Sequence, residues 1–467
     1  MRAGLVLLAL TACQPPAPAP PGSLVLIVLD TVRVDHLSAY GYERATSPFL
    51  EELAGEGTRY ARAWSSSAWT LPAHASMFTG LPPRLHGADQ TTLHLQGDQD
   101  LLAERLVAAG YQTAGFSNNP WVSADTGLVD GFGRYAELWR RRQRPRTLWG
   151  DPTSEAVARW IADERDPEKP FFLFVNLMEA HGPYEPAWRD AWPLLGGPLQ
   201  TWKRARRYEQ VEERGFVRAW YLGDEPVPPE AIEAAKDLYD AEIHQGDAAV
   251  ARIVAALDQV ADPASTTLLV VTDHGETFGE HGLMGHNFSL CETLLRTAVV
   301  ARGPGFVAGA VEDGVVQLND VFPTLLAAAG LPYDAQEGAL DLHAPPPGIR
   351  PLEASYAYPR QVFGTFPPAQ RSSRRLDPYR RALAAGLDGR FKLVRDSKGG
   401  EEVFDLVTDP GEEHPLPAPD PAVVARLRAL AQGLEGDPGE GGGPEGLDPE
   451  TAEELQRLGY LDGEGMR

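Results

Sequence analysis

Acidic and imidazole side chains follow two apolar segments of the sequence at the point where each segment ends. Asp30 follows residues 24–29, and Asp273-His274 follows residues 267–272. A carboxylate beside an imidazole suits a transition metal such as zinc or manganese. An isolated Asp-His pair also occurs as a helix cap or in a satisfied loop. We nevertheless expect a metal site here, because two further histidines follow closely.

Those two histidines are His281 and His286, which lie in a loop spaced by glycines and offering little packing use for imidazoles. At least one of them is expected to face the site. Asn118 and Asn119 follow another strand-like segment, residues 112–116, and are candidates for contact with a bound anion. A turn role at Asn119-Pro120 is an equally good interpretation of that pair.

A hydroxyl-rich stretch, residues 65–70, precedes a predicted helix entered through Pro72. A hydroxyl at a helix N-terminus lies beside backbone N–H groups that stabilise an adjacent anion. A hydroxyl of this stretch is therefore a candidate for a place beside a bound anion, and for Thr70 the structural alternative is an ordinary N-cap.

The elements that must position these residues alternate along the chain. An uninterrupted apolar run over residues 23–30, repeated in pattern over 170–177 and 267–273, is typical of parallel strands buried on both faces. Helical spacing of apolar residues covers 47–55, 101–110 and 232–260. The alternation predicts a doubly wound α/β sheet, whose sites lie outside the carboxyl ends of the strands.

Composition changes along the chain predict its organisation. We expect a signal peptide over residues 1–13, a Pro-rich tether over 14–22 and a catalytic domain over 23–330. Shorter strand candidates at 391–394 and 402–406 predict a smaller C-terminal subdomain over 331–416. Residues 417–467 are predicted to be an acidic Gly/Pro-rich tail, in which Asp448 and Pro449 open a short terminal helix.

Composition also excludes several classes of protein. The 467 residues carry a formal net charge of −24, so a nucleic acid polymer is not an expected partner. Two cysteines exclude a disulfide scaffold. The sequence contains no G-x-S-x-G element, which disfavours a Ser-His-Asp esterase. Two basic clusters, at residues 140–146 and 203–207, are interpreted as solvated helix faces or as a surface attracting an anionic substrate or lipid headgroup.

Cys13 closes the N-terminal segment after Arg2 and the short apolar run of residues 5–10. The run is too short to span a bilayer and fits a signal-peptide core. Leu-Thr-Ala-Cys resembles the bacterial lipobox, in which the cysteine is lipidated. We expect a lipid anchor on Cys13 and a location in the bacterial cell envelope, facing the periplasm or exterior. An ordinary secretory signal with an incidental cysteine is the alternative.

The order of these motifs resembles that of the sulfatase family, within the alkaline phosphatase superfamily. The resemblance rests on residues 30–37, 70–80, 181–184, 273–282 and 302–305, and it is strengthened by residues 239–243, 320–326 and 404–410. It covers residues 23 to about 416. It implies an alkaline-phosphatase-like α/β/α sandwich with a smaller C-terminal α+β subdomain.

One departure bears on the chemistry. Sulfatases carry Cys or Ser in a C/S-x-P-S-R signature, and that residue is oxidised to formylglycine. Here the same place holds Thr70, whose β-carbon bears a methyl group, and His74 replaces the signature arginine. His274 replaces the usual asparagine and His286 the common lysine. The departure resembles phosphate-ester members of the superfamily, which use an unmodified Thr or Ser on a transition metal. The resemblance therefore implies that Thr70 is the nucleophile and that His74, at the place of the arginine, binds substrate.

The resemblance assigns roles to the residues that match its motifs. Asp30, Asp273 and His274 are expected to hold a divalent metal with Thr70, zinc or manganese in preference to calcium. His181 and His286 are expected to contact the substrate's oxygens directly or through a second metal.

The expected substrate is a small anionic ester. Hydrolysis or transfer of phosphate esters, including phospholipid headgroups, is the favoured activity. The alternatives are a true sulfuric ester hydrolase acting on sulfated glycans or aryl sulfates, and a catalytically silent envelope lipoprotein that binds anions.

Overall fold

The computed structural model describes residues 22–141, 152–213, 215–334, 338–434 and 448–458, and Cys13 and the predicted tether lie outside them. Its centre is an eight-stranded sheet of order β10-β2-β9-β6-β1-β5-β3-β4, in which β9 alone runs antiparallel to its neighbours. The strands are β1 (Leu24–Leu29), β2 (Thr58–Trp64), β3 (Gln112–Ser117), β4 (Arg134–Glu137), β5 (Phe171–Leu177), β6 (Thr267–Thr272), β9 (Arg296–Arg302) and β10 (Ala310–Gln317).

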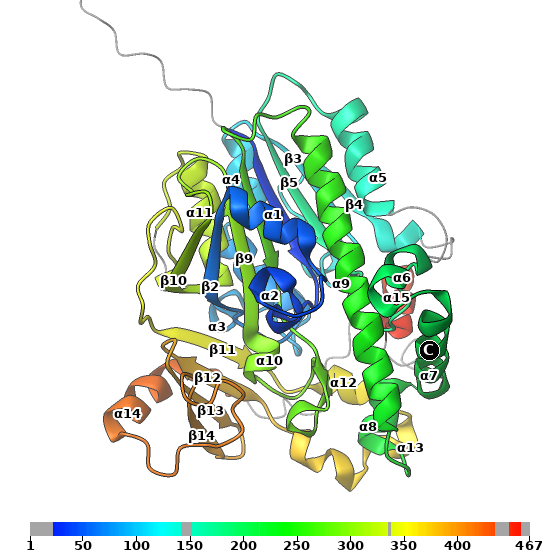
Figure 1. Cartoon of the computed structure of the whole chain (residues 1–467). Helices are drawn as coiled ribbons and strands as arrows, with labels where there is room; N and C mark the ends of the chain where they lie inside the picture. The colour runs from blue at the N-terminus through cyan, green and yellow to red at the C-terminus, as the bar shows by residue number, and fades with distance from the viewer. Residues whose placement is uncertain (1–21, 142–151, 214, 335–337, 435–447, 459–467) are drawn as a thin grey trace, which may run out of the picture.

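Side chains of β1 alternate between the two faces of this sheet, and each face is covered by helices (Figure 1). One face is covered by α1 (Pro48–Glu56), α5 (Pro152–Arg159) and α9 (Pro229–Leu257). The other is covered by α2 (Thr70–Thr79), α4 (Leu102–Ala108) and α11 (Val321–Ala328). The predicted α/β sandwich is thereby confirmed.

A second layer of helices packs on α9, the longest helix among the described residues. It consists of α6 (Trp188–Leu195) and α7 (Pro198–Glu212), followed by α8 (Phe216–Leu222). A two-stranded ribbon of β7 (Thr277–Phe278) and β8 (Met284–Gly285) lies beside α8 and α9. None of the described helices is long and apolar enough to cross a membrane.

The C-terminal part forms a separate antiparallel sheet of order β11-β12-β13-β14. Its strands are β11 (Leu352–Tyr356), β12 (Leu383–Leu387), β13 (Phe391–Asp396) and β14 (Glu401–Asp405). The predicted tail contains α14 (Pro421–Leu430), whose Leu427 packs into the core of this sheet. The described residues also form four short helices, α3 (Pro83–His86), α10 (Glu292–Leu295), α12 (Arg360–Gly364) and α13 (Pro368–Arg371).

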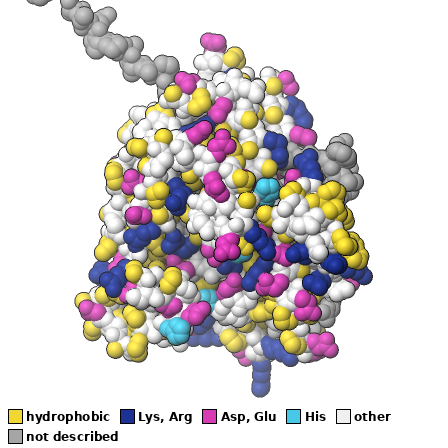
Figure 2. Space-filling model, in the orientation of Figure 1, with side chains coloured by type: hydrophobic (Ala, Val, Ile, Leu, Met, Phe, Trp, Pro, Cys, Tyr) yellow, Lys and Arg dark blue, Asp and Glu magenta, His cyan; other side chains and the backbone are white. Residues whose placement is uncertain are grey.

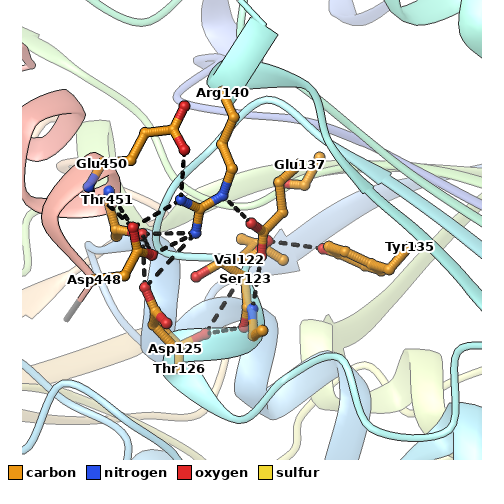
Figure 3. Close-up of polar contacts among 12 residues, drawn as sticks. Val122, Ser123, Asp125, Thr126, Tyr135, Glu137, Arg140, Asp448, Glu450 and Thr451 are labelled. Carbon is orange, nitrogen blue, oxygen red and sulfur yellow. Dashed lines mark hydrogen bonds and ion pairs between the residues drawn. The ribbon is translucent and has the colours of Figure 1, made fainter. Parts of the chain in front are cut away.

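The terminal helix α15 (Pro449–Arg457) begins where Asp448 and Pro449 predict it, and the Asp448 carboxylate accepts the Glu450 and Thr451 N–H groups. Figure 3 shows how Arg140, after β4, holds this helix. Its guanidinium contacts Asp448, Glu450 and Glu137. Residues separated by about 300 positions in the sequence are thus joined by ion pairs.

Candidate active site

Two buried carboxylates meet at the carboxyl ends of neighbouring strands, as predicted. β1 delivers Asp30 and β6 delivers Asp273, and these strands pair directly in the sheet. Asp273 Oδ1 accepts the backbone N–H groups of Thr31 (2.9 Å) and His274 (2.8 Å). Asp30 Oδ2 accepts two side-chain amides instead, so one oxygen of each carboxylate is held in place.

The other oxygen of each carboxylate, Asp30 Oδ1 or Asp273 Oδ2, is buried and has no hydrogen-bond partner among the described residues. His274 lies with them, and one ligand atom from each of the three residues lies within 4.8 Å of the others. His274 Nδ1 donates to the Gly275 carbonyl at 3.0 Å, so the neutral ring carries its lone pair on Nε2. Oriented oxygens without donors and an imidazole lone pair fit a divalent cation.

Electrostatics point to the same conclusion. Burial raises the pKa of Asp273 from 3.8 to about 7, and burial together with the charge of Asp273 raises that of Asp30 to about 7. Burial lowers the pKa of His274, so this ring is neutral. A cation bound between Asp30 and Asp273 would stabilise the ionised form of both carboxylates.

Thr70 lies in the first turn of α2, two residues before the predicted entry at Pro72. Trp69 is the N-cap and makes no side-chain cap hydrogen bond, so Thr70 does not serve as an N-cap. Its Oγ1 lies 3.3 Å from His274 Nε2 and accepts from Asn119 Nδ2 at 3.3 Å. The threonine hydroxyl is therefore part of the carboxylate–imidazole cluster.

Asn119, two residues after the end of β3, and Asn176, within the neighbouring strand β5, hold Asp30 in place. Their Nδ2 groups donate to Asp30 Oδ2 at 2.7 Å and 2.9 Å. Asn119 was expected to contact an anion, and the structure places it on the carboxylate and on Thr70. Asn176 was missed, although an asparagine inside a wholly apolar strand is a sequence signal for a buried polar contact.

Tyr239 of α9 belongs to the segment 239–243 that strengthened the family resemblance, with no role assigned to it. Its hydroxyl accepts the Arg33 N–H and donates to the Thr31 carbonyl, each at 2.7 Å. These contacts fix the loop that follows β1, in which Thr31 has a positive φ of 57°. The loop in turn supplies an N–H group to Asp273.

His181 and His286 come together beside His274. The ring centroid of His286 lies 5.2 Å from that of His181 and 4.9 Å from that of His274. His286 Nδ1 lies 3.3 Å from Glu276 Oε1, and His181 Nδ1 donates to the Gly182 carbonyl at 2.7 Å. Glu276, which the sequence motif contained without a role, is thus a residue of the site.

Burial sets the protonation of this group. It lowers the pKa of His181 to about 3, and it lowers that of His286 well below the ordinary value. Burial also raises the pKa of Glu276 to about 7. Neutral imidazoles whose Nδ1 atoms face acceptors present their Nε2 lone pairs elsewhere, as ligands or proton acceptors.

A cavity of about 320 Å³ ends at these three side chains. Most of its wall is apolar or aromatic, and the residues that form this part include Tyr184, Tyr208, Phe216, Phe278, Met284 and Phe366. Contacts therefore lead from Thr70 through His274 and His286 to a cavity with largely apolar walls. Leu458, directly after α15, also lines the cavity.

Three candidates lie elsewhere than expected. His74 is fully buried against the cluster, where Nδ1 donates to the Thr70 carbonyl at 2.9 Å and lies 3.7 Å from Asp273 Oδ2, and burial lowers its pKa to about 3. Asn118 donates to Thr153 of α5. His281 is exposed on a 3₁₀ turn, Glu280–Gly282, so of the two loop histidines it is His286 that faces the site.

The comparison with protein families matches the sulfatase model over residues 23–331. The arylsulfatase of Clostridium perfringens is 25% identical over 388 residues, which cover 68% of this chain and 76% of that protein.

Among solved structures, the phosphonate monoester hydrolase of Agrobacterium radiobacter aligns with a TM-score of 0.64 at 21% identity. That alignment covers 87% of this chain and 93% of the other. A 2-O GAG sulfatase aligns with a TM-score of 0.65 at 16% identity, over 94% and 100% of the two chains. These likenesses show an alkaline-phosphatase-like fold, and the family match shows that this chain belongs to the sulfatase family of ester hydrolases.

Proposed function

We propose that this sulfatase-family hydrolase acts on phosphate esters, as a hydrolase or transferase, with Thr70 as its nucleophile. One observation carries the proposal: a threonine hydroxyl that caps no helix is held between His274 Nε2 and Asn119 Nδ2, next to two carboxylates with unpartnered oxygens. The position of Thr70 at the start of α2 places the developing negative charge at the positive end of a helix.

Asp30, Asp273 and His274 would hold the cation, with Thr70 beside them. When bound, a divalent cation lowers the pKa of a neighbouring hydroxyl and offsets the charge of the anionic substrate. Asn119 and Asn176 keep Asp30 in one orientation, and the Gly275 carbonyl fixes the tautomer of His274. We propose zinc or manganese over calcium, because the donor set includes imidazole.

The reaction would proceed in two displacements. Thr70 Oγ1 forms a bond to phosphorus as the bond to the leaving alcohol breaks, and the hydroxyl proton leaves to a base. Water or an acceptor alcohol then breaks the Oγ1–phosphorus bond and regenerates the threonine. Neutral His181 and His286, at the end of the cavity, are placed to accept a proton or to contact the phosphoryl group.

The preference for phosphate over sulfate rests on the chemistry of threonine. A methyl group on Cβ prevents conversion to formylglycine, so the hemiacetal route for releasing sulfate is closed to Thr70. The apolar cavity favours esters with an apolar alcohol, including phosphodiesters and phospholipid headgroups with attached chains. Sulfuric ester hydrolysis is the second candidate, since the curated relative from Clostridium perfringens is an arylsulfatase.

A pair of Thr70 variants tests the proposal. Thr70→Ala removes the nucleophile and should lower kcat for bis(p-nitrophenyl) phosphate by about 10³-fold or more, whereas Thr70→Ser keeps a hydroxyl and should retain most of the activity. Both variants should bind the same metal content as the wild type. Full turnover by Thr70→Ala, or hydrolysis of p-nitrophenyl sulfate faster than any phosphate ester, would refute the proposal.

We also propose that lipid on Cys13 anchors the protein in the bacterial cell envelope. The support is the Leu-Thr-Ala-Cys sequence and the Pro-rich stretch that follows it. A single acyl chain binds a membrane only weakly and reversibly, whereas several acyl chains on one cysteine would anchor the protein stably. Mass spectrometry of the mature N-terminus decides between this modification and an unlipidated chain that begins elsewhere.

A further inference from the structure

The outer faces of α6 and α7 expose an unusual set of side chains. The tryptophans Trp188, Trp192 and Trp202 are 38%, 38% and 51% exposed, and Leu199 is 62% exposed. The chain contains 10 tryptophans, and five of those in the described residues are fully buried, so three exposed tryptophans within one helical pair require an explanation. We name these four residues the tryptophan patch.

Helical spacing gathers the patch on one side. Trp188 and Trp192 lie one turn apart on α6, with ring centroids 6.2 Å apart, and Leu199 and Trp202 lie three residues apart on α7. Both helices pack on α9, and their buried residues are Ala191 and Leu195 of α6 and Thr201, Tyr208 and Val211 of α7. On α7 the buried residues lie opposite Leu199 and Trp202, whereas on α6 they lie next to Trp188 and Trp192, whose rings sit at the edge of the packed face. Packing of the fold therefore leaves a large part of the patch exposed to solvent.

Cations surround the patch in a chain that is otherwise strongly acidic. Residues 188–207 contain Arg189, Lys203, Arg204, Arg206 and Arg207 but a single acidic residue, Asp190. Arg189 pairs with Asp190 and Arg206 with Glu209, yet their side chains are 51% and 55% exposed. Lys203 and Arg207 are exposed too, whereas Arg204 is half-buried and paired with Asp237. Figure 2 shows hydrophobic and basic side chains together over α6 and α7, at the right of the view.

We propose that the tryptophan patch and its flanking cations form a docking surface for a lipid bilayer that contains anionic lipids. Tryptophan prefers the level of the headgroups, because its ring is apolar and its N–H is polar. Lysine and arginine extend their apolar stems along the same layer and pair with anionic headgroups. Apolar and basic residues on one helical face are the pattern of helices that lie in the interface.

Charge argues against a second copy of this chain as the occupant. A symmetric dimer through this patch would place Lys203, Arg206 and Arg207 of each protomer opposite their equivalents, and like charges repel. An anionic bilayer offers the complementary charge over the whole surface. The whole chain has a formal net charge of −24, so this basic region is the face that would approach such a bilayer.

Docking here would bear on the active site through α7. Tyr208 and Glu212 of this helix line the cavity that ends at His181, Glu276 and His286. One helix thus carries Trp202 on the outer side and a wall of the substrate cavity on the inner side. A docked molecule would hold the cavity beside the bilayer, whichever ester it hydrolyses.

Vesicle binding tests the inference without reference to activity or to the lipid anchor. The full chain with Cys13→Ser is mixed with vesicles of phosphatidylcholine, with or without phosphatidylglycerol, and bound protein is measured by sedimentation. We expect binding to the anionic vesicles, a blue shift of tryptophan fluorescence, and loss of binding in high salt.

Two variants and two matched controls localise the binding. Trp192→Gln with Trp202→Gln should weaken binding by about tenfold or more, and Lys203→Gln with Arg206→Gln and Arg207→Gln by roughly 10- to 100-fold. Ile349→Gln, at a residue 67% exposed elsewhere, and Lys398→Gln should leave binding unchanged. Circular dichroism checks that each variant folds.

Three results would overturn the inference. The first is a wild type that does not bind anionic vesicles, and the second is a set of patch variants that bind as well as the wild type. The third is self-association, measured by sedimentation velocity, that the tryptophan variants abolish in the absence of vesicle binding. That last result would assign the patch to a second copy of the chain.

Discussion

Replacing Asn119 with alanine removes the side chain that joins the nucleophile to the metal site. Asn119 Nδ2 donates to Asp30 Oδ2 at 2.7 Å and to Thr70 Oγ1 at 3.3 Å. A hydrogen bond to a charged group contributes about 1.5–3 kcal/mol, which corresponds to a factor of roughly 10 to 150. Removing a residue that hydrogen-bonds to a metal ligand lowers metal affinity or activity by about 10- to 100-fold. We therefore expect a loss of about 10- to 100-fold.

The neighbouring residue supplies a matched control. Asn118 has the same side chain, and it donates to Thr153 instead of to the cluster. Asn118→Ala should therefore keep the metal affinity and kcat/KM of the wild type. Asn119→Ala also leaves the Trp121 N–H without its acceptor, at a cost of about 1–3 kcal/mol in the free energy of unfolding, which a folded domain tolerates.

Two quantities are measured for both variants. Zinc affinity is measured by competition with a fluorescent chelator, and kcat/KM is measured with bis(p-nitrophenyl) phosphate at saturating zinc. Both quantities should fall for Asn119→Ala alone. Unchanged values for Asn119→Ala, or equal losses for the two variants, would show that Asp30 and Thr70 do not depend on this amide.

Two further predictions concern the C-terminal region. Lys392 is buried between Glu292 and Glu412, with its Nζ 2.9 Å from an oxygen of each. Lys392→Met should lower the free energy of unfolding by about 3–5 kcal/mol, measured by guanidinium denaturation, because it leaves two buried carboxylates without their cation. Exposed Lys398→Met is the control, and equal denaturation midpoints for the two variants would contradict the prediction. Arg140 holds the pKa of Asp448 well below 3.8, so α15 docking is stabilised above that pH and weakened as the pH falls below it. Hydrogen exchange of residues 449–457, corrected for the intrinsic rates, should accelerate in acid and in Arg140→Gln, and full protection in Arg140→Gln at neutral pH would refute this role.

Much of the fold could be predicted because its signals are local. The apolar runs before Asp30 and Asp273 are six-residue strands buried on both faces, and the rule that parallel strands end at one edge brings the two carboxylates together. The apolar spacing of residues 232–260 predicted α9, which spans Pro229–Leu257. These inferences need no knowledge of which strands are neighbours.

Contacts between distant segments could not be predicted in this way. Glu276 lies ten residues from His286, yet only the turn of β7 into β8 places the two side chains together. His281 occupies an equally suggestive position but is exposed, and its own backbone is left-handed, with φ 53°. His74 matched a signature arginine, but its ring is fully buried between the Thr70 carbonyl and Asp273.

The attachment of α15 through Arg140 has a consequence for the nascent chain. Leu458 follows this helix and lines the cavity, whereas Asp30, Thr70 and His274 come from much earlier segments. The carboxylate cluster can therefore assemble during synthesis before the wall of the cavity is complete. Closure waits until residues 448–458 have left the ribosome and found Arg140, so a chain interrupted before this point carries the metal ligands beside an unfinished cavity.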